Sequence, residues 1–212
     1  MIRIVIADDH AIVREGLKRI VSSGQDLELV GEAADGTEVM QRVRELAFDV
    51  LVLDLSMPGR SGMELIKLVK AEQPRLRILI LSMHQEMQYA IRAIKSGASG
   101  YLTKDSAPAQ LEQAIRKIAA GGAYISAEVA EQLALGAMPD ARAAPHEALS
   151  DREFDVLRQL AGGASITEIA AALKLSVKTV STHKANGMAK MGLANESELV
   201  RYALKHGLIE DS

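Results

Sequence analysis

The sequence predicts an α/β domain built on a five-stranded, parallel, doubly wound sheet, followed by a small all-α domain. Short apolar runs alternate with helical apolar periodicity over about the first 120 residues, and strands that alternate with helices form parallel sheets. Polar residues follow most of the apolar runs, at the positions where the strands should end. Helix-capping signals then follow one another closely from Ser150 to the C-terminus, which predicts the all-α domain.

The strand from Val50 to Leu53 is an unbroken apolar run, which is typical of a parallel strand buried on both faces. The predicted strands are Ile2–Ile6, Leu27–Val30, Val50–Leu53, Ile78–Leu81 and Gly100–Leu102. The predicted helices are Ile12–Val21, Gly36–Leu46, Ser61–Ala71, Tyr89–Ile94 and Ser106 to Gly121. This alternation defines a first domain over residues 1–121.

The remainder of the chain is expected to be a linker and a helical domain. Residues 122–148 contain a short helix from Ser126 to Leu135 and an Ala- and Pro-rich segment, Gly136 to Ala148, which has no periodicity. The helical domain covers residues 149–212. Its four helices begin at Ser150-x-x-Glu153, Ser165-x-x-Glu168, Ser176 and Asn195-x-x-Glu198, and the third ends at Gly192.

Composition excludes several classes of protein. The 212 residues carry a net charge of -3 and contain no cysteine, which rules out disulfides and thiol chemistry and suits a reducing compartment. No apolar run reaches the roughly 20 residues of a membrane span. Aromatic residues make up only 3% of the chain, too few for a platform that stacks single-stranded nucleic acid. We therefore expect a cytoplasmic protein without a membrane partner.

Polar side chains should meet at one edge of the sheet, because the carboxyl ends of parallel strands lie together there. These side chains are Asp8, Asp9, Asp54, Ser82 and Lys104. Each alone is more often a turn residue, but together they form a site. Three carboxylates repel one another by about 4 kcal/mol per close pair, and a divalent cation relieves this repulsion. Oxygen ligands suit Mg²⁺, and a cation, a lysine and a hydroxyl around one carboxylate are what phosphoryl transfer to Asp54 requires.

Four segments in the first domain carry a family resemblance. ADDH at 7–10, DLSMPGRSG at 54–62, LSMH at 81–84 and YLTKD at 101–105 resemble the receiver domain of bacterial response regulators, a flavodoxin-like α/β fold. The resemblance implies that Asp54 accepts a phosphoryl group from a sensor histidine kinase. It also implies a set of supporting roles: Asp9, Asp54 and the Ser56 backbone carbonyl bind Mg²⁺, Asp8 acts through water, Ser82 and Tyr101 form a switch pair, and Lys104 contacts the phosphoryl group.

The short helix, turn and longer capped helix of the second domain predict a helix-turn-helix, whose second helix enters the DNA major groove. A plain packing bundle is the alternative. Charge favours DNA binding, since four lysines and no acid lie between Ile169 and Asn195. The lysines are Lys174, Lys178, Lys184 and Lys190, and the short groove-reading side chains are Thr179, Ser181, Thr182, His183 and Asn186.

The segment from Leu149 to about His206 resembles the LuxR-type DNA-binding domain, so the whole chain resembles a NarL/FixJ-type two-component response regulator. Two positions depart from the family pattern. Gly187 stands where a large aliphatic residue is usual, which predicts a cost of about 1 kcal/mol and a loss of packing. The run Lys184-Ala185-Asn186 is less basic than is common, which predicts low non-specific affinity for DNA.

Two alternative functions compete with a phosphorylation-switched transcription factor. A Mg²⁺-dependent phosphatase that works through an aspartyl phosphate requires a second aspartate two residues after the nucleophile, and this position holds Ser56. We therefore do not expect an enzyme, beyond phosphorylation and dephosphorylation of Asp54 itself. The other alternative is a DNA-binding regulator that does not respond to phosphate.

Phosphorylation is expected to act through association or release of the two domains, because the linker allows more than one arrangement. Ser82 and Tyr101 would reshape the face that carries the fourth and fifth helices. Apolar side chains expected there, Ile115 and Ile118, would then favour a homodimer that binds two half-sites of double-stranded DNA.

Overall fold

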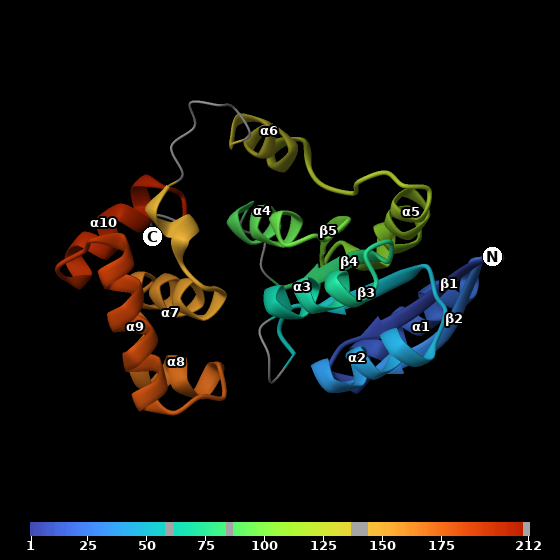
Figure 1. Ribbon diagram of the computed structural model, residues 1–212, viewed down its shortest axis with the longest axis horizontal. Coiled ribbons are helices and arrows are strands. Elements are labelled where there is room, and N and C mark those ends of the chain that lie inside the picture. Colours follow the sequence, from blue (N-terminus) through green and yellow to red (C-terminus); the bar gives the residue numbers. More distant parts are fainter. Residues whose placement is uncertain (58–61, 84–86, 137–143, 210–212) are drawn as a thin grey trace. The chain divides into compact units, whose positions relative to one another are not determined.

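The computed structural model describes residues 1–57, 62–83, 87–136 and 144–209. The chain divides into two compact units, Met1–Leu135 and Gly136–Ser212 (Figure 1). Each unit has its own core, as expected for two domains of this size. Within the described ranges, every helix is too short or too polar to cross a membrane.

The first unit contains the predicted five-stranded sheet. Its strands are β1 (Ile2–Ala7), β2 (Leu27–Ala33), β3 (Val50–Asp54), β4 (Arg77–Ser82) and β5 (Gly100–Thr103). All pairs are parallel and the order is β2-β1-β3-β4-β5, which confirms the predicted doubly wound sheet. Each strand ends later than predicted. In β3, β4 and β5 the added residues are polar and still belong to the ladder: Asp54 pairs with Leu81, and Ser82 with Thr103.

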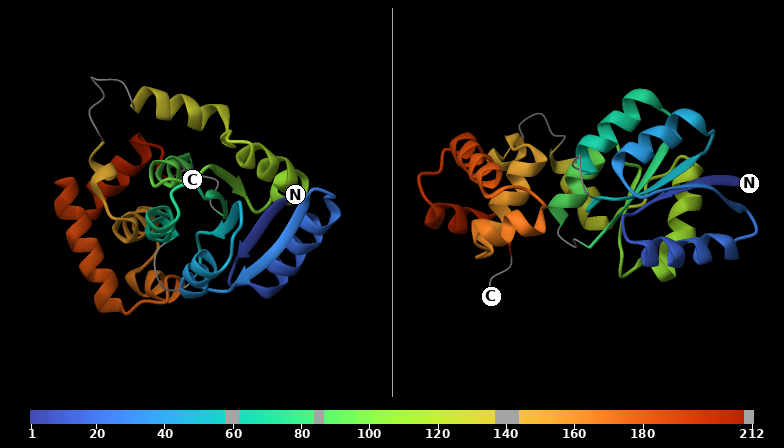
Figure 2. Two further views of the ribbon diagram at one scale, coloured as in Figure 1. Left: turned by 45° about the vertical axis from the view of Figure 1, so that its right-hand side comes forward. Right: turned by 90° about the horizontal axis from the view of Figure 1, so that it is seen from below.

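Helices cover both faces of this sheet (Figure 2). On one face lie α1 (Ala11–Ser23) and α5 (Ala107–Ala119); on the other lie α2 (Gly36–Glu45), α3 (Gly62–Glu72) and α4 (Met87–Lys95). All five predicted helices are present, although the expected first residue of the third, Ser61, lies outside the described residues. The strand β3 is buried over its whole length, as its unbroken apolar run predicts.

The prediction that Ile115 and Ile118 face a dimer partner is wrong. Both side chains are fully buried and belong to the core between the sheet, α1 and α5, together with Leu111 and Ala114. These residues form the apolar stripe of α5, with spacings of three and four residues, and such a stripe faces the core of a surface helix.

A sixth helix, α6 (Ala127–Gly136), packs within the first unit through Val129, which shares a buried apolar cluster with Ala90 and Ile91 of α4. The half-buried Tyr101 lies against the same cluster. Because of this contact, the first compact unit continues to Leu135, beyond the expected boundary at residue 121.

The described residues of the second unit form a short 3-10 helix and four α-helices. They are η1 (Pro145–Ala148), α7 (Asp151–Ala161), α8 (Ile166–Ala172), α9 (Val177–Met191) and α10 (Glu196–Lys205). Ser150 with Glu153 and Ser165 with Glu168 form the predicted capping boxes, and Ser176 and Asn195 cap their helices. Gly192 ends α9 in the left-handed region, at φ 66°. The capping signals therefore predicted these helix starts correctly.

The expected linker ran from Gly136 to Ala148. Residues 137–143 lie outside the described part of the chain, but the last four linker residues form η1 and belong to the helical unit. His146 of η1 is 5% exposed, and its Nδ1 lies 2.8 Å from the Tyr202 hydroxyl of α10. This contact ties the start of the unit to its last helix, which no local sequence pattern indicates.

Gly187 occupies the point where α9 passes close to α7. A Cβ atom at this position would lie 2.8 Å from Leu157 Cδ1 and 3.1 Å from its Cγ. The predicted loss of packing is therefore wrong, because Leu157, which is 2% exposed, already fills the space that a larger residue would take. The glycine permits a close helix–helix approach.

Candidate functional site

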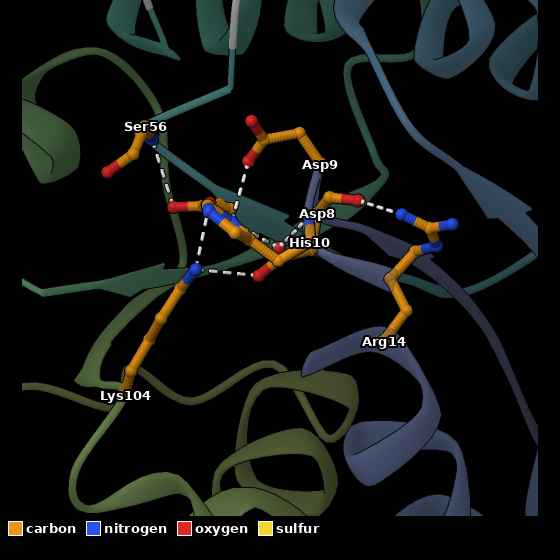
Figure 3. Close-up of polar contacts among 7 residues, drawn as sticks. Asp8, Asp9, His10, Arg14, Ser56 and Lys104 are labelled. Atoms are coloured by element: carbon orange, nitrogen blue, oxygen red, sulfur yellow. Dashed lines mark hydrogen bonds and ion pairs between the residues drawn. The ribbon is translucent and has the colours of Figure 1, made fainter. Parts of the chain in front are cut away.

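The acidic edge predicted from the sequence is present at the carboxyl ends of β1 and β3. Ala7 pairs with Leu53, so Asp8, which follows β1, lies at the same level as Asp54, the last residue of β3. Both are fully buried, and Asp8 Oδ1 accepts a hydrogen bond of 2.8 Å from the backbone N–H of His10. The backbone N–H of Ser56 donates to Asp54 Oδ1 at 2.9 Å (Figure 3).

Lys104 bridges these two buried carboxylates. Its Nζ lies 2.7 Å from Asp8 Oδ2 and 2.8 Å from Asp54 Oδ2 (Figure 3). The neighbouring strands position it, because its backbone N–H donates to the carbonyl of Ser82 at the end of β4. The sequence therefore predicted correctly that Lys104 would reach the acidic edge.

A wider cluster surrounds this bridge. Asp8, Asp9, His10 and Asp54 each offer a ligand atom within 4.8 Å of the others. Three of the four are carboxylates, the ligand type that Mg²⁺ prefers, so the donor set fits this cation. His10 was not predicted; its Nδ1 lies 2.9 Å from Asp9 Oδ1 (Figure 3). Arg14 was also missed, and it donates to the backbone carbonyl of Asp8 at 2.6 Å. Their position just after Asp9 and in the first turn of α1 was the available signal.

Burial and charge act in opposite directions on the pKa values of Asp54 and Lys104. Burial raises the pKa of Asp54, and the nearby charge of Asp8 adds to this, while Lys104 and the Ser56 N–H oppose it. Burial alone would lower the pKa of Lys104, but its hydrogen bonds to Asp54 and Asp8 raise it. The ammonium is thus held in its charged form beside more negative charge than it can neutralise.

The two predicted switch residues lie on adjacent strands, β4 and β5. Ser82 is fully buried at the end of β4. Tyr101 of β5 is half-buried and packs near Met87, Ala90 and Val129. Tyr101 therefore connects β5 to the apolar cluster in which α6 packs on α4.

The predicted helix-turn-helix is formed by α8, a turn and α9. Lys174, in the turn, adopts φ 54°, and among the described residues other than glycine it alone has a positive φ. One stripe of α9 is exposed and available to a partner. It consists of Lys178, Ser181, Thr182, Ala185, Asn186 and Ala189. The opposite face, with Val180, Met188 and Met191, is buried in the unit.

The predicted groove-reading side chains are partly engaged within their own helix. The hydroxyl of Ser181 donates to the Val177 carbonyl at 2.9 Å, and that of Thr182 donates to the Lys178 carbonyl at 3.0 Å. Thr179 is hydrogen-bonded to the side chain of the capping Ser176 through both its backbone N–H and its hydroxyl. His183 is half-buried, whereas Asn186 is exposed.

Lys184 and Lys190 are paired with acids that the sequence did not connect to them. Lys190 Nζ lies 2.7 Å from Glu153 Oε2 of α7, and that carboxylate is buried. Lys184 pairs with Glu196, the first residue of α10. The lysine-rich, acid-free segment is therefore less basic in three dimensions than in the sequence.

Comparison with known proteins decides the family. The family model described as the response regulator receiver domain matches residues 4–116, and that of the bacterial regulatory proteins of the luxR family matches residues 147–203. The chain belongs to the NarL/FixJ-type response regulators. This response regulator carries a receiver domain and a LuxR-type DNA-binding domain, and its family acts in two-component regulation of transcription.

Several relatives match the response regulator over nearly its full length. The response regulator UvrY of Escherichia coli K12 is 34% identical over 98% of this chain and 96% of its own. The oxygen regulatory protein NreC of Staphylococcus epidermidis is 40% identical over 98% of this chain and 99% of its own. Among solved structures, RcsB of Salmonella enterica serovar Typhimurium, bound to the promoter rprA with the phosphomimetic BeF3-, is 33% identical, with a TM-score of 0.62 over 95% of this chain and 98% of that one.

Proposed function

We propose that this response regulator is phosphorylated on Asp54 by a sensor histidine kinase, and that phosphorylation controls sequence-specific DNA binding by α9. The observation that carries the proposal is the buried Asp54 carboxylate at the end of the central strand, with the Lys104 ammonium 2.8 Å away. A protein that binds genomic DNA acts where the DNA lies, so the proposed location is the cytoplasm.

In the proposed reaction, a carboxylate oxygen of Asp54 attacks the phosphorus of a phosphohistidine. The new P–O bond forms as the P–N bond breaks, and the histidine nitrogen leaves with the electron pair. Asp54 is aligned for this step by the Ser56 N–H on Oδ1 and by Lys104 on Oδ2. As negative charge reaches the edge of the sheet, Lys104 moves its hydrogen bond from Asp54 to the phosphoryl oxygens.

The proposed cofactor is Mg²⁺, which supplies neutralising charge for the carboxylates and the phosphoryl oxygens. The residues that would hold it are Asp9, Asp54 and the Ser56 backbone carbonyl, with Asp8 acting through water. The described carboxylates support this assignment because their oxygens lie within one cluster. Arg14 and the His10 N–H, which bond Asp8, would keep that side chain and its strand end in place.

The proposed response to phosphate passes through Ser82 and Tyr101. Ser82 would turn its hydroxyl toward the phosphoryl group, which makes room for Tyr101 to turn inward. Tyr101 packs near Ala90 and Val129, so its movement would change the surface on which α6 rests. Because α6 leads toward the DNA-binding unit along the chain, we propose that this change alters how the two units associate.

The proposed DNA contacts are made by the helix-turn-helix. Lys174 and Lys178 contact phosphates, while Thr182 and Asn186 of the exposed stripe read base edges, with Thr179, Ser181, His183 and Lys184 as further candidates. The RcsB structures include dimers and DNA complexes of that protein. By analogy, we propose a phosphorylation-dependent homodimer on two half-sites.

The decisive test is phosphorylation of the full chain by acetyl phosphate with Mg²⁺, followed by mass spectrometry. Wild type should gain one phosphoryl group and Asp54→Asn none, whereas Asp105→Asn, which changes an exposed acid near the same edge, should be labelled like wild type. Equal labelling of Asp54→Asn would place the phosphoacceptor elsewhere. In parallel, beryllofluoride should increase both the mass in sedimentation and the DNA affinity of wild type; a regulator that ignores phosphate would show neither change.

A further inference from the structure

The pairing of Lys184 with Glu196 places a negative charge beside α9, the recognition helix that we propose enters the major groove. Glu196 begins α10, directly after a turn that reverses the chain at Gly192. Its carboxylate reaches back to the ammonium of Lys184, 12 residues earlier on α9. In the sequence, the segment from Ile169 to Asn195 contains no acid. In the fold, the next residue after that segment brings one back to it.

The surroundings of this acid include part of the exposed stripe of α9. Lys184 and Glu196 line an open hollow of about 660 Å³ together with Ser181 and Ala185, and both of those belong to the exposed stripe of α9. The Glu196 side chain is 58% exposed, whereas that of Lys184 is 27% exposed. A phosphate that approaches this edge of the stripe would therefore meet the carboxylate as well as the ammonium.

The ion pairs of Lys190 and Lys184 differ in burial, and this difference indicates different roles. Lys190 is bound to Glu153, whose side chain is 6% exposed and also closes the capping box of α7, so this pair holds α9 against α7. The Lys184 pair is at the surface, where ion pairs are weak and exchange readily. A DNA phosphate can replace the Glu196 carboxylate as the partner of Lys184, but it cannot replace Glu153 at Lys190.

We propose that Glu196 sets the affinity of the recognition helix for DNA by competing with backbone phosphate for Lys184. In the free protein the carboxylate neutralises Lys184, and in the complex its charge repels the adjacent phosphate. Together these effects remove the one phosphate contact that Lys184 would make, so binding relies more on base contacts and on a second copy of the chain. This inference rests on the proposed docking of α9 in the major groove.

The test measures binding of the full chain to a labelled random-sequence duplex by fluorescence anisotropy, at several salt concentrations, with and without beryllofluoride and Mg²⁺. Glu196→Gln should tighten binding about three- to tenfold at low salt and steepen the salt slope by about 0.9, the value for one added phosphate contact. Lys184→Ala should weaken binding little in wild type, but severalfold in the Glu196→Gln background. Asp155→Asn removes the same charge on α7, where the carboxylate pairs with Arg152, and is the control.

The outcomes separate the inference from the proposed function. If Lys178→Ala weakens binding while Glu196→Gln changes neither affinity nor slope, α9 docks on DNA and the role of Glu196 is overturned. Equal tightening by Asp155→Asn and Glu196→Gln reduces the effect to overall charge and also overturns it. If wild type binds no duplex in either state, the proposed function fails and the inference falls with it. Unchanged thermal unfolding of Glu196→Gln confirms that affinity, and not folding, has changed.

Discussion

The ammonium of Lys104 lies 2.8 Å from the carboxylate of Asp54, although 50 residues separate the two in the chain. The same ammonium contacts Asp8, so one lysine is paired with two buried acids from different strands. The contact between Lys104 and Asp54 therefore has two consequences. It holds the acidic edge together before phosphorylation, and it keeps a cation next to the oxygen on which we propose the phosphoryl group arrives.

Replacing Lys104 by alanine should destabilise the first unit by about 3 kcal/mol in the presence of EDTA, because it leaves Asp8 and Asp54 buried beside each other without a cation. Millimolar Mg²⁺ should return part of this loss, since a bound cation stabilises the folded state. Urea denaturation with EDTA or Mg²⁺ measures both effects. Lys67→Ala, at an exposed position of α3, is the control and should leave stability almost unchanged. A Lys104→Ala variant as stable as wild type in EDTA would contradict this account.

Replacing Asp54 by asparagine should stabilise the metal-free protein at pH 7 by about 1 kcal/mol relative to wild type. Burial raises the pKa of Asp54 in the folded state above the ordinary value of about 3.9. The free energy of unfolding of the wild type therefore falls as the pH rises from this ordinary value to the folded-state pKa. The gain from the substitution should therefore shrink as the pH falls toward 4. Urea denaturation at a series of pH values in EDTA checks the sign, and a gain that grows on acidification would refute it.

Replacing Gly187 by alanine should destabilise the helical unit by about 1 kcal/mol. The added Cβ displaces the buried Leu157, which costs about 2 kcal/mol, and the higher helix propensity of alanine returns about 1 kcal/mol. Gly16 of α1 is a matched control, because a Cβ there meets nothing within 4 Å. Gly16→Ala should therefore stabilise the first unit by about 1 kcal/mol. Calorimetry of the two variants measures the sign of each change in unfolding free energy. Equal stabilisation by both substitutions would show that Leu157 moves aside without loss of stability.

Replacing Lys190 by alanine should destabilise the helical unit by about 2 kcal/mol, because it leaves the buried Glu153 without its cation. Burial alone would raise the pKa of Glu153, but Lys190 and the capping N–H of Ser150 hold it below its usual value. This contribution is present above the ordinary pKa of about 4.3 and is lost as the pH falls through the folded-state pKa.

The same variant should not change the salt dependence of DNA binding. Lys178→Ala, on the exposed stripe of α9, should do the opposite: the salt slope should fall by about one contact and stability should stay the same. Denaturation and anisotropy titration of both variants separate the two roles. A lower salt slope in Lys190→Ala would show that Lys190 contacts phosphate after all.

The sequence by itself determined the elements and the acidic edge. The unbroken apolar run before Asp54 predicts a central strand, and strand order in a doubly wound sheet brings strand ends to one edge, so Asp8, Asp54 and Lys104 could be placed together. The helix starts at Ser150 and Ser165 were equally predictable, because a capping box is complete within four residues. These features are local or periodic, and such signals can be read without a partner segment.

Only the tertiary structure decided which residue lies against which. Ile115 belongs to an apolar stripe that could face a core or a dimer, and the packing of α5 on the sheet buries it. Gly187 fits because Leu157 approaches it from another helix. Lys184 and Lys190 look alike in the sequence, yet one pairs with an exposed acid and the other with a buried one. Such pairings depend on distances between helices, and the spacing of residues along one helix carries no information about them.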